Sequence, residues 1–242
     1  MSGRFEAIGD YKYAYETHLH TKEGSACGRN SGSEMAKAYK EAGYAGIIVT
    51  DHFFGGNTAI DRSLPWSDWV EGYCKGYENA KKTGDEIGLQ VFFGWEQTYL
   101  GTDFLIYGLD KEWLLKHPEI REVTIEEQYE LVHKDGGMVI HAHPFREEFY
   151  IPQIRLFPEY VDGVEVLNAS HAHKFGTVDG KNCEYDIKAK AYALEHDFPQ
   201  TGGSDIHSVD LFWGGMAFTH KLDTVFDYMK AVQNREGIVL PL

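Results

Sequence analysis

Short apolar segments alternate with amphipathic segments along most of the chain. The apolar segments have the length and the turn-forming borders of buried β-strands, and the first of them alternates apolar with polar residues. The predicted strands are 13–21, 45–52, 89–96, 103–109, 138–144, 162–168 and 215–219, with a further strand segment within 198–207. The predicted helices are 31–43, 66–88, 124–137, 185–196 and about 222–234. Two of these helices begin with the spacing of a capping box, Ser31 with Glu34 and Thr124 with Glu127.

Strands that alternate with helices favour parallel β/α units. About seven such units would close into a single α/β barrel, and 242 residues are a normal length for one. An open, doubly wound sheet fits the pattern nearly as well, but no Gly-rich phosphate fingerprint follows the first strand. We therefore predict one barrel domain that spans residues 1–242.

Composition narrows the class of protein. Hydrophobic residues make up 43% of the chain and no run is long enough to span a bilayer, so we expect a soluble protein with no membrane partner. The N-terminal residues lack the pattern of a secretory signal, and Cys27, Cys74 and Cys183 are odd in number and widely spaced. Both features favour the cytoplasm. A net charge of −15 argues against double-stranded nucleic acid as a partner, but not against a small anionic substrate.

Histidines and acidic residues gather where the predicted strands end. They are His18, His20, Asp51, His52, Glu96, His141, His143, His171, His173, Asp205 and His207. In a β/α barrel the carboxyl ends of the strands meet on one face, so these residues would share a pocket. Imidazole and carboxylate groups together bind Zn, Mn or Fe ions, and the H-x-H spacing directs two rings to one side of a strand. We expect two or three divalent transition metals.

Each piece also has a plainer interpretation. A lone H-x-H pair is more often a surface or core pair than a set of ligands. Asp51 is explained equally well as a turn cap, and His141, which alternates with His143, as a packing residue on the opposite side of the strand. The metal interpretation rests on the conjunction of six strand ends, because independent causes would have to act at every one of them.

The motifs resemble those of the PHP (polymerase and histidinol phosphatase) family of metal-dependent phosphoesterases. They are "HLHT", "TDH", the Glu of "GWE", "HAHP", the His that follows "VEVLNAS", and "GSDIH", in the family's order from residue 18 to 207. The resemblance implies a distorted (β/α)7 TIM-like barrel with a metal centre of two or three ions at the carboxyl ends of its strands.

The resemblance also implies a ligand set. One metal would be held by His18, His20, Glu96 and Asp205, and a second by Glu96, His143 and His171, which fits the family's spacing better than His173 does. A third would be held by His52 and His207. At this third site the family usually adds an Asp within "T-x-x-S-D-G", whereas this chain has "TKEGSACG", so Glu23 is the nearest substitute. Asp51 and His141 are expected behind the ligands, with Asp51 orienting His52.

The chemistry implied is hydrolysis of a small phosphomonoester or phosphodiester by a metal-activated hydroxide, with Glu96, Asp205 and Arg146 in catalytic roles. Arg146 is the first candidate to hold the phosphate, and Arg29 and His173 are further substrate-binding candidates. Either His173 or Asp205 is expected to carry a proton to the leaving group. The long segments 53–66 and 144–160 are expected to wall the substrate pocket.

Two alternatives stay open. An amidohydrolase-type barrel also begins with H-x-H, but it typically places a bridging Lys where this chain has Glu96. A metal-bound PHP domain that serves only as an interaction module is the other. The identity of the phosphoester, the metals bound and the oligomeric state do not follow from the sequence.

Overall fold

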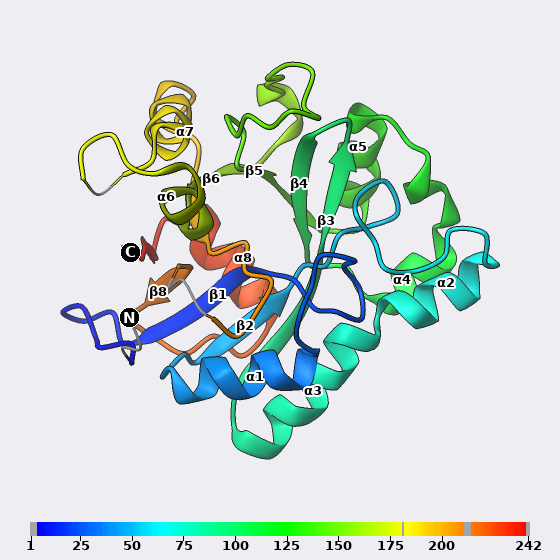
Figure 1. Ribbon diagram of the computed structural model, residues 1–242, viewed down its shortest axis with the longest axis horizontal. Coiled ribbons are helices and arrows are strands. Elements are labelled where there is room, and N and C mark those ends of the chain that lie inside the picture. The colour runs from blue at the N-terminus through cyan, green and yellow to red at the C-terminus, as the bar shows by residue number, and fades with distance from the viewer. Residues whose placement is uncertain (1–3, 181, 211–213, 241–242) are drawn as a thin grey trace.

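The strands form one sheet that curls into a nearly closed barrel (Figure 1). The computed structural model describes residues 4–180, 182–210 and 214–240. Within these ranges the sheet has the strand order β7-β6-β5-β4-β3-β2-β1-β8-β9. The strands are β1 (Tyr13–Leu19), β2 (Gly46–Val49), β3 (Gln90–Tyr99), β4 (Thr102–Tyr107), β5 (Met138–Ala142), β6 (Gly163–Asn168), β7 (Gln200–Gly203), β8 (Met216–Phe218) and β9 (Ile238–Val239).

Helices cover the outside of the sheet and one end of the barrel. They are α1 (Gly32–Glu41), α2 (Trp66–Tyr73), α3 (Lys75–Ile87), α4 (Lys111–Lys116), α5 (Ile125–Lys134), α6 (Ala169–Phe175), α7 (Glu184–Glu195) and α8 (Val225–Gln233), with 3-10 turns η1 (Pro118–Arg121) and η2 (Pro158–Tyr160). Helices α1 and α3 pack on β1 and β2, α2, α4 and α5 pack on β3 and β4, and α7 packs on β6. Helix α8 lies behind the centre of the barrel, where its Tyr228 packs against Tyr107 and Phe218 (Figure 1).

The barrel closes between β1 and the segment that follows β7. The backbone N–H of His20 donates to the carbonyl of Ile206 at 2.9 Å, and Leu19 and Ile206 form a parallel bridge. Lower in the barrel the Thr17 hydroxyl donates to the Gly202 carbonyl at 2.7 Å. This closure confirms the predicted TIM-like barrel and excludes the open sheet. It also brings the ligand-bearing segments at the ends of β1 and β7 side by side.

Two of the predicted strands, β4 and β8, depart from the parallel pattern, and β8 pairs antiparallel with β1. Strand β4 pairs antiparallel with both β3 and β5, because only Leu100 and Gly101 separate it from β3 and two residues allow a hairpin but no helical crossover. Both turn residues have positive φ, 50° and 84°. The amino end of β4, not its carboxyl end, therefore lies at the mouth of the barrel, beside the carboxyl ends of its neighbours.

The predicted helices are largely confirmed. Both capping boxes form, at the start of α1 and of α5. The predicted helix 66–88 is divided at Cys74 into α2 and α3. Helices α4 and α6 were not predicted, because six and seven residues are too short to show a helical period.

A bulge in β1 directs the first two histidines into the barrel. The β1–β2 register shifts between Glu16 and Leu19. Below the shift, Tyr15 packs in the barrel interior and Glu16 points outward to the Tyr39 hydroxyl of α1. Above it, Leu19 packs in the outer core, so the alternate residues His18 and His20 face the mouth.

Candidate metal centre

One buried carboxylate lies among four imidazoles at the barrel mouth. Glu96 ends the buried part of β3, and its side chain is fully buried. Its Oε1 lies 3.5 Å from Nε2 of His18 and 3.0 Å from Nε2 of His143. Its Oε2 lies 3.7 Å from Nε2 of His20 and contacts Nδ1 of His52. The four rings come from the carboxyl ends of β1, β2 and β5, so the fold gathers three distant parts of the chain around Glu96.

Asp205 faces the same centre from the segment after β7. Its Oδ1 lies 3.0 Å from Nε2 of His20 and 3.6 Å from Nε2 of His18. Asp205 and His143 both have positive φ, 53° and 30°. A residue with a side chain adopts this region at a cost of about 1–3 kcal/mol, and such strain clusters at functional sites.

Several metal-binding atoms of these side chains form no hydrogen bond of normal geometry. Within the described residues, His18 Nε2, His20 Nε2, His52 Nδ1 and Glu96 Oε2 are buried and make only the close contacts with one another and with Asp205 given above. Buried polar atoms are nearly always satisfied, so four atoms without a normal hydrogen bond in one place need a partner of another kind. Nitrogen and carboxylate donors converging at these distances fit divalent transition metals.

The charges at the centre favour ionised carboxylates. Burial raises the pKa of Glu96, but the nearby His52, His143 and His18 outweigh burial and hold this pKa well below its usual value. Asp205 behaves in the same way, with burial opposed by His18, His20 and His207. Burial and the neighbouring His52 and His207 together hold the pKa of His20 well below its usual value, so its ring is neutral. These are the forms of Glu96, Asp205 and His20 that bind metals. Burial lowers the pKa values of His18 and His52, but Glu165 and Asp205 outweigh burial and raise the pKa of His18, and Glu96 does the same for His52, so these two rings would release a proton on metal binding.

His171 is the buried member of the "SHAH" stretch. It is 1% exposed on α6, its ring centre lies 6.2 Å from that of His143, and its Nε2 has no hydrogen-bond partner among the described residues. Its Nδ1 lies 2.8 Å from Oδ1 of Asp186 on α7. His173 is exposed and lies on the wall of the pocket. The structure therefore places His171 facing His143 and places His173 where a substrate would pass.

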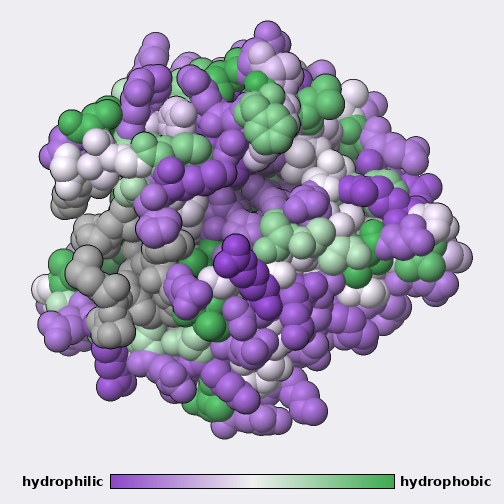
Figure 2. Space-filling model, in the orientation of Figure 1, coloured by the Kyte–Doolittle hydropathy of each residue, from purple (hydrophilic) through white to green (hydrophobic). Residues whose placement is uncertain are grey.

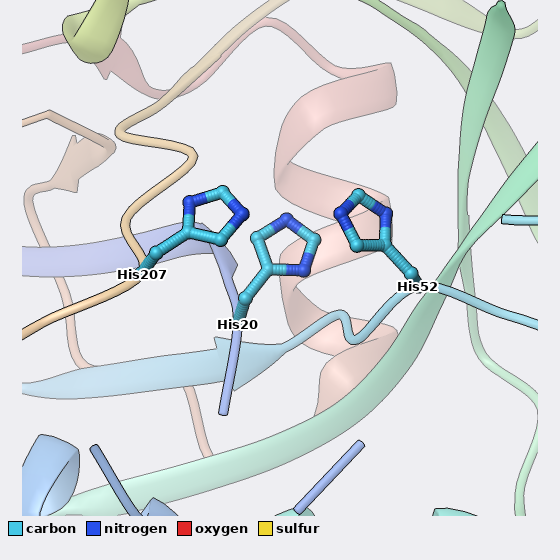
Figure 3. Close-up of side chains that lie close together, drawn as sticks. All are labelled: His20, His52 and His207. Atoms are coloured by element: carbon cyan, nitrogen blue, oxygen red, sulfur yellow. The ribbon is translucent and has the colours of Figure 1, made fainter. Parts of the chain in front are cut away.

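His20 and His52 also belong to a second group of three imidazoles, which His207 completes (Figure 3). The ring of His20 stacks 4.4 Å from that of His207 and lies 4.3 Å from that of His52. Figure 3 shows the three rings turned toward one another. Burial raises the pKa of the Cys27 thiol, but the neighbouring His207 and His52 outweigh burial and lower it to about 6.

Glu23 is not brought to the three imidazoles. Its carboxylate accepts hydrogen bonds from the backbone N–H of Gly32 at 3.1 Å and from the amide of Asn79 at 2.9 Å. The contact with Gly32 is at the first turn of α1, where free N–H groups favour a carboxylate. The expectation that Glu23 completes the third metal site therefore conflicts with its position, because its side chain caps a helix instead.

Further side chains hold the candidate ligands in place. Asp51 accepts hydrogen bonds from the N–H of Thr21 and from the hydroxyl of Ser25, at 2.6 and 2.7 Å. Ser25 in turn lies 3.1 Å from Nδ1 of His20 and accepts the backbone N–H of His52. Asp51 was expected to orient the ring of His52 directly. It acts instead through Ser25, which contacts His20 and the backbone of His52.

Glu165 and His141 lie next to the candidate ligands, and of these two only His141 was expected to do so. Oε1 of Glu165 lies 2.8 Å from Nδ1 of His18, and Gly203 leaves the room for this pair, since a Cβ there would fall 2.4 Å from that of His18. His141 stacks on Phe104 with ring centres 5.0 Å apart. Both of its ring nitrogens lack hydrogen-bond partners among the described residues, so it packs and does not orient a ligand.

A guanidinium lies next to the carboxylates of the centre. Arg146 Nη2 lies 3.0 Å from Oδ2 of Asp103, and Nη1 lies 3.5 Å from Oδ2 of Asp205. Burial lowers the pKa of Arg146, but the two carboxylates outweigh burial and raise it, so the side chain is fully charged. Asp103 stands at the amino end of β4, which is at the mouth only because β4 runs antiparallel.

A cavity of about 1280 Å³ opens above the centre. Figure 2 shows a hollow near the middle of this face with hydrophilic residues around it. Arg29, Arg146, His173, Asp205 and His207 all line the cavity. Residues of the segments 53–66 and 144–160 line it as well, as expected for substrate walls.

Sequence reasoning missed five residues near the centre: Ser25, Cys27, Asp103, Glu165 and Asp186. Cys27 and Ser25 carried a usable signal, because they lie in the segment where an additional ligand is expected. Asp186 lies within a helix far along the chain, and Asp103 lies at the start of a strand, so neither is marked by the pattern of strand ends.

Comparison with known proteins supports the fold. No family model matches the chain. An uncharacterized protein of Methanocaldococcus jannaschii is 27% identical over 166 residues, which are 64% of this chain and 82% of the relative. No helix among the described residues is long and apolar enough to cross a membrane.

Three solved structures resemble the chain over most of its length. A two-domain protein from Bacteroides vulgatus that contains a predicted PHP-like metal-dependent phosphoesterase has a TM-score of 0.68 at 14% identity, over 98% of this chain and 67% of that one. PsfC from Pseudomonas syringae has a TM-score of 0.63 at 17% identity, over 95% of this chain and 91% of its own. Endonuclease Q, solved with a duplex that carries an abasic lesion, has a TM-score of 0.55 at 13% identity, over 92% of this chain and 56% of its own.

These likenesses bear on the expectations from sequence. Endonuclease Q has a similar fold and was solved with a DNA duplex. The fold therefore does not support the expectation, drawn from the acidic composition, that double-stranded nucleic acid is excluded as a partner. The resemblance to the PHP family is borne out at the level of structure. The chain has the barrel fold of the PHP-like metal-dependent phosphoesterases, with the metal-binding type of side chain gathered at its mouth.

Proposed function

We propose that the protein is a metal-dependent phosphoesterase that hydrolyses a phosphomonoester or phosphodiester at a centre of two or three metals. The observation that carries the proposal is the buried carboxylate of Glu96 among four imidazoles, beside the charged Arg146 and under an open cavity. Ligand-type groups alone would fit a structural metal site. A cationic side chain directed into a cavity beside them fits a site that receives an anion.

The proposed ligand set is the one that the family's motifs imply, and it is supported in part by the donor atoms that lie together. His18, His20, Glu96 and Asp205 would hold one ion, and Glu96, His143 and His171 a second. His20, His52 and His207 surround the place for a third. Zn, Mn and Fe suit such mixed donors. When bound, these ions supply a water of lowered pKa and positive charge for the phosphate oxygens.

The chain's own residues supply the rest of the chemistry. Arg146 donates to the non-bridging oxygens of the phosphate, because its guanidinium is charged and already held in place by Asp103 and Asp205. Asp205 stays ionised, since its pKa is held well below its usual value, so it does not serve as the proton donor. His173 on the cavity wall is the side chain that we propose carries the proton to the leaving group.

The test combines metal analysis with a substrate panel. The full chain is purified, analysed for metals, and assayed with and without chelator on phosphomonoesters, phosphodiesters, a duplex with an abasic site, and amides. We expect transition metals to copurify and phosphoester hydrolysis to be lost with chelator and restored by metal. Glu96→Ala should lower the rate by more than about 100-fold, because even residues behind a metal ligand are worth 10- to 100-fold.

The matched control is Glu112→Ala, a carboxylate 81% exposed on α4, which should retain full activity. Cleavage of amides in place of phosphoesters would favour the amidohydrolase alternative. Stoichiometric metal without any hydrolysis would favour the interaction domain. Undiminished hydrolysis by metal-stripped Glu96→Ala protein would refute the proposal.

A further inference from the structure

The thiol of Cys27 contacts the three-imidazole group at the barrel mouth. Cys27 lies between β1 and α1 and lines the large cavity together with His52 and His207. Both rings lie close enough to the thiol to shift its pKa. We call Cys27, His20, His52 and His207 the thiol–imidazole cluster. The other two cysteines, Cys74 and Cys183, are buried elsewhere.

The backbone around Cys27 is fixed at the cluster. The N–H of Ala26 donates to the carbonyl of Asn57 at 2.8 Å, and the N–H of Arg29 donates to the carbonyl of His207 at 2.8 Å. Gly28 allows the turn, because a Cβ there would lie 2.3 Å from the carbonyl oxygen of Thr21. The loop thus carries the thiol into the cavity on a tethered backbone.

The imidazoles of the cluster point to a ligand independently of the thiol. His20 is fully buried, and its ring lies between those of His52 and His207 (Figure 3). Its Nε2 lies 3.0 Å from Oδ1 of Asp205 but forms no hydrogen bond of normal geometry among the described residues. The candidate donor atoms of these three histidines lie within 4.8 Å of one another. A fully buried nitrogen turned into such a group requires a partner that accepts several nitrogen donors at once.

We infer that Cys27 is a metal ligand of the thiol–imidazole cluster, in the place that Glu23 was expected to take. One sulfur and the surrounding imidazoles form a soft donor set, which selects Zn²⁺, Fe²⁺ or Co²⁺ over Mn²⁺ and Mg²⁺. Binding forms a metal–sulfur bond and releases the thiol proton to solvent, so no oxidant or reductant is involved. The inference rests on the metal centre of the proposed function and specifies one of its ligands.

Cobalt absorption tests the ligand without relying on activity. The metal-free full chain is titrated with Co²⁺, and bound cobalt is counted. Wild-type protein should develop a near-ultraviolet sulfur-to-cobalt charge-transfer band as the cluster fills. Cys27→Ser should lose the band and bind one fewer cobalt ion per chain, whereas the control Cys74→Ser should keep both the band and the count.

Cys27→Asp guards against a variant that simply misfolds. A carboxylate at this position should restore the cobalt count without the band and shift the cluster's preference toward Mn²⁺. A full cobalt count without a band in wild-type protein, or an unchanged band in Cys27→Ser, would overturn the inference. A band in a protein that hydrolyses no phosphoester would sink the proposed function and leave the ligand assignment standing. Phosphoester hydrolysis by a protein that shows no band would overturn the ligand assignment and leave the proposed function standing.

Discussion

Oδ1 of Asp186 on α7 lies 2.8 Å from Nδ1 of His171 on α6, and it also accepts the backbone N–H of Asn168 at 3.2 Å. The contact leaves Nε2 as the free donor atom of the ring, buried without a partner among the described residues. A carboxylate that fixes one ring nitrogen and leaves the other for a metal is a common support of histidine ligands. Two helices that follow β6 thereby complete the centre.

Removing this support should weaken metal binding. Asp186→Ala is expected to lower the affinity for one ion by about 10- to 100-fold, because the His171 ring loses its fixed orientation. A chelator competition titration on the full chain measures the change. Glu184→Ala, an exposed carboxylate of the same helix, is the control and should bind like the wild type. Unchanged affinity in Asp186→Ala would mean that His171 is not a ligand.

Arg146 should govern productive binding of phosphate. Arg146→Ala removes a charged donor beside Asp205 and should lower kcat/KM by about 1.5–3 kcal/mol, roughly 10- to 150-fold. Arg146→Lys should recover only part of the loss, since an ammonium lacks the fork that suits phosphate. Steady-state kinetics measures both. Arg235→Ala, which removes an exposed guanidinium paired with Asp197, should leave kcat/KM unchanged.

Asp103 should act through Arg146 and not on the metals. Asp103→Asn removes the carboxylate that holds the guanidinium at 3.0 Å, so kcat/KM should fall by less than in Arg146→Ala. In an Arg146→Ala background the same change should have little further effect, because the two residues act as a unit. Metal content is measured in parallel. A loss of bound metal would instead identify Asp103 as a ligand, since it lies near Glu96 and His143.

Glu23 should contribute to stability and not to metal binding. Glu23→Ala removes an acceptor for the Gly32 N–H at the start of α1, and loss of such a cap costs about 1 kcal/mol of unfolding free energy. Urea unfolding measures this cost, with Glu86→Ala, an exposed carboxylate on α3, as the control. The count of bound metals should stay at the wild-type value. A variant that lost one ion would place Glu23, and not Cys27, at the third site.

Acid should abolish the contribution of the α1 capping box. The backbone N–H and hydroxyl of Ser31 donate to the Glu34 carboxylate and lower its pKa to about 2, from an ordinary value of 4.5. The folded state therefore binds fewer protons between these values, so the contribution is complete above pH 4.5 and is lost as pH falls through 2. The difference in urea midpoint between wild type and Glu34→Gln should shrink over this range. Glu41→Gln, at the other end of α1, should show no such trend.

The order of strands and helices was readable from sequence because each element carries a local signal. The capping boxes at Ser31 and Thr124 are contacts between residues three apart, and both form. The histidines of "HLHT" share a side because side chains alternate along a strand, and the barrel then brings the strand ends together. For these residues, local geometry and the correct choice of fold were sufficient to predict that they lie together.

Other parts of the centre depended on contacts that no local pattern contains. Asp103 reaches the mouth because β4 reverses, and Asp186 reaches His171 because α7 packs beside α6. The choice between Glu23 and Cys27 depended on which way each side chain of one loop points, and backbone hydrogen bonds to Asn57 and His207 decide that. Residue types at the strand ends are thus set by sequence, whereas the neighbours of each donor atom are set by long-range packing.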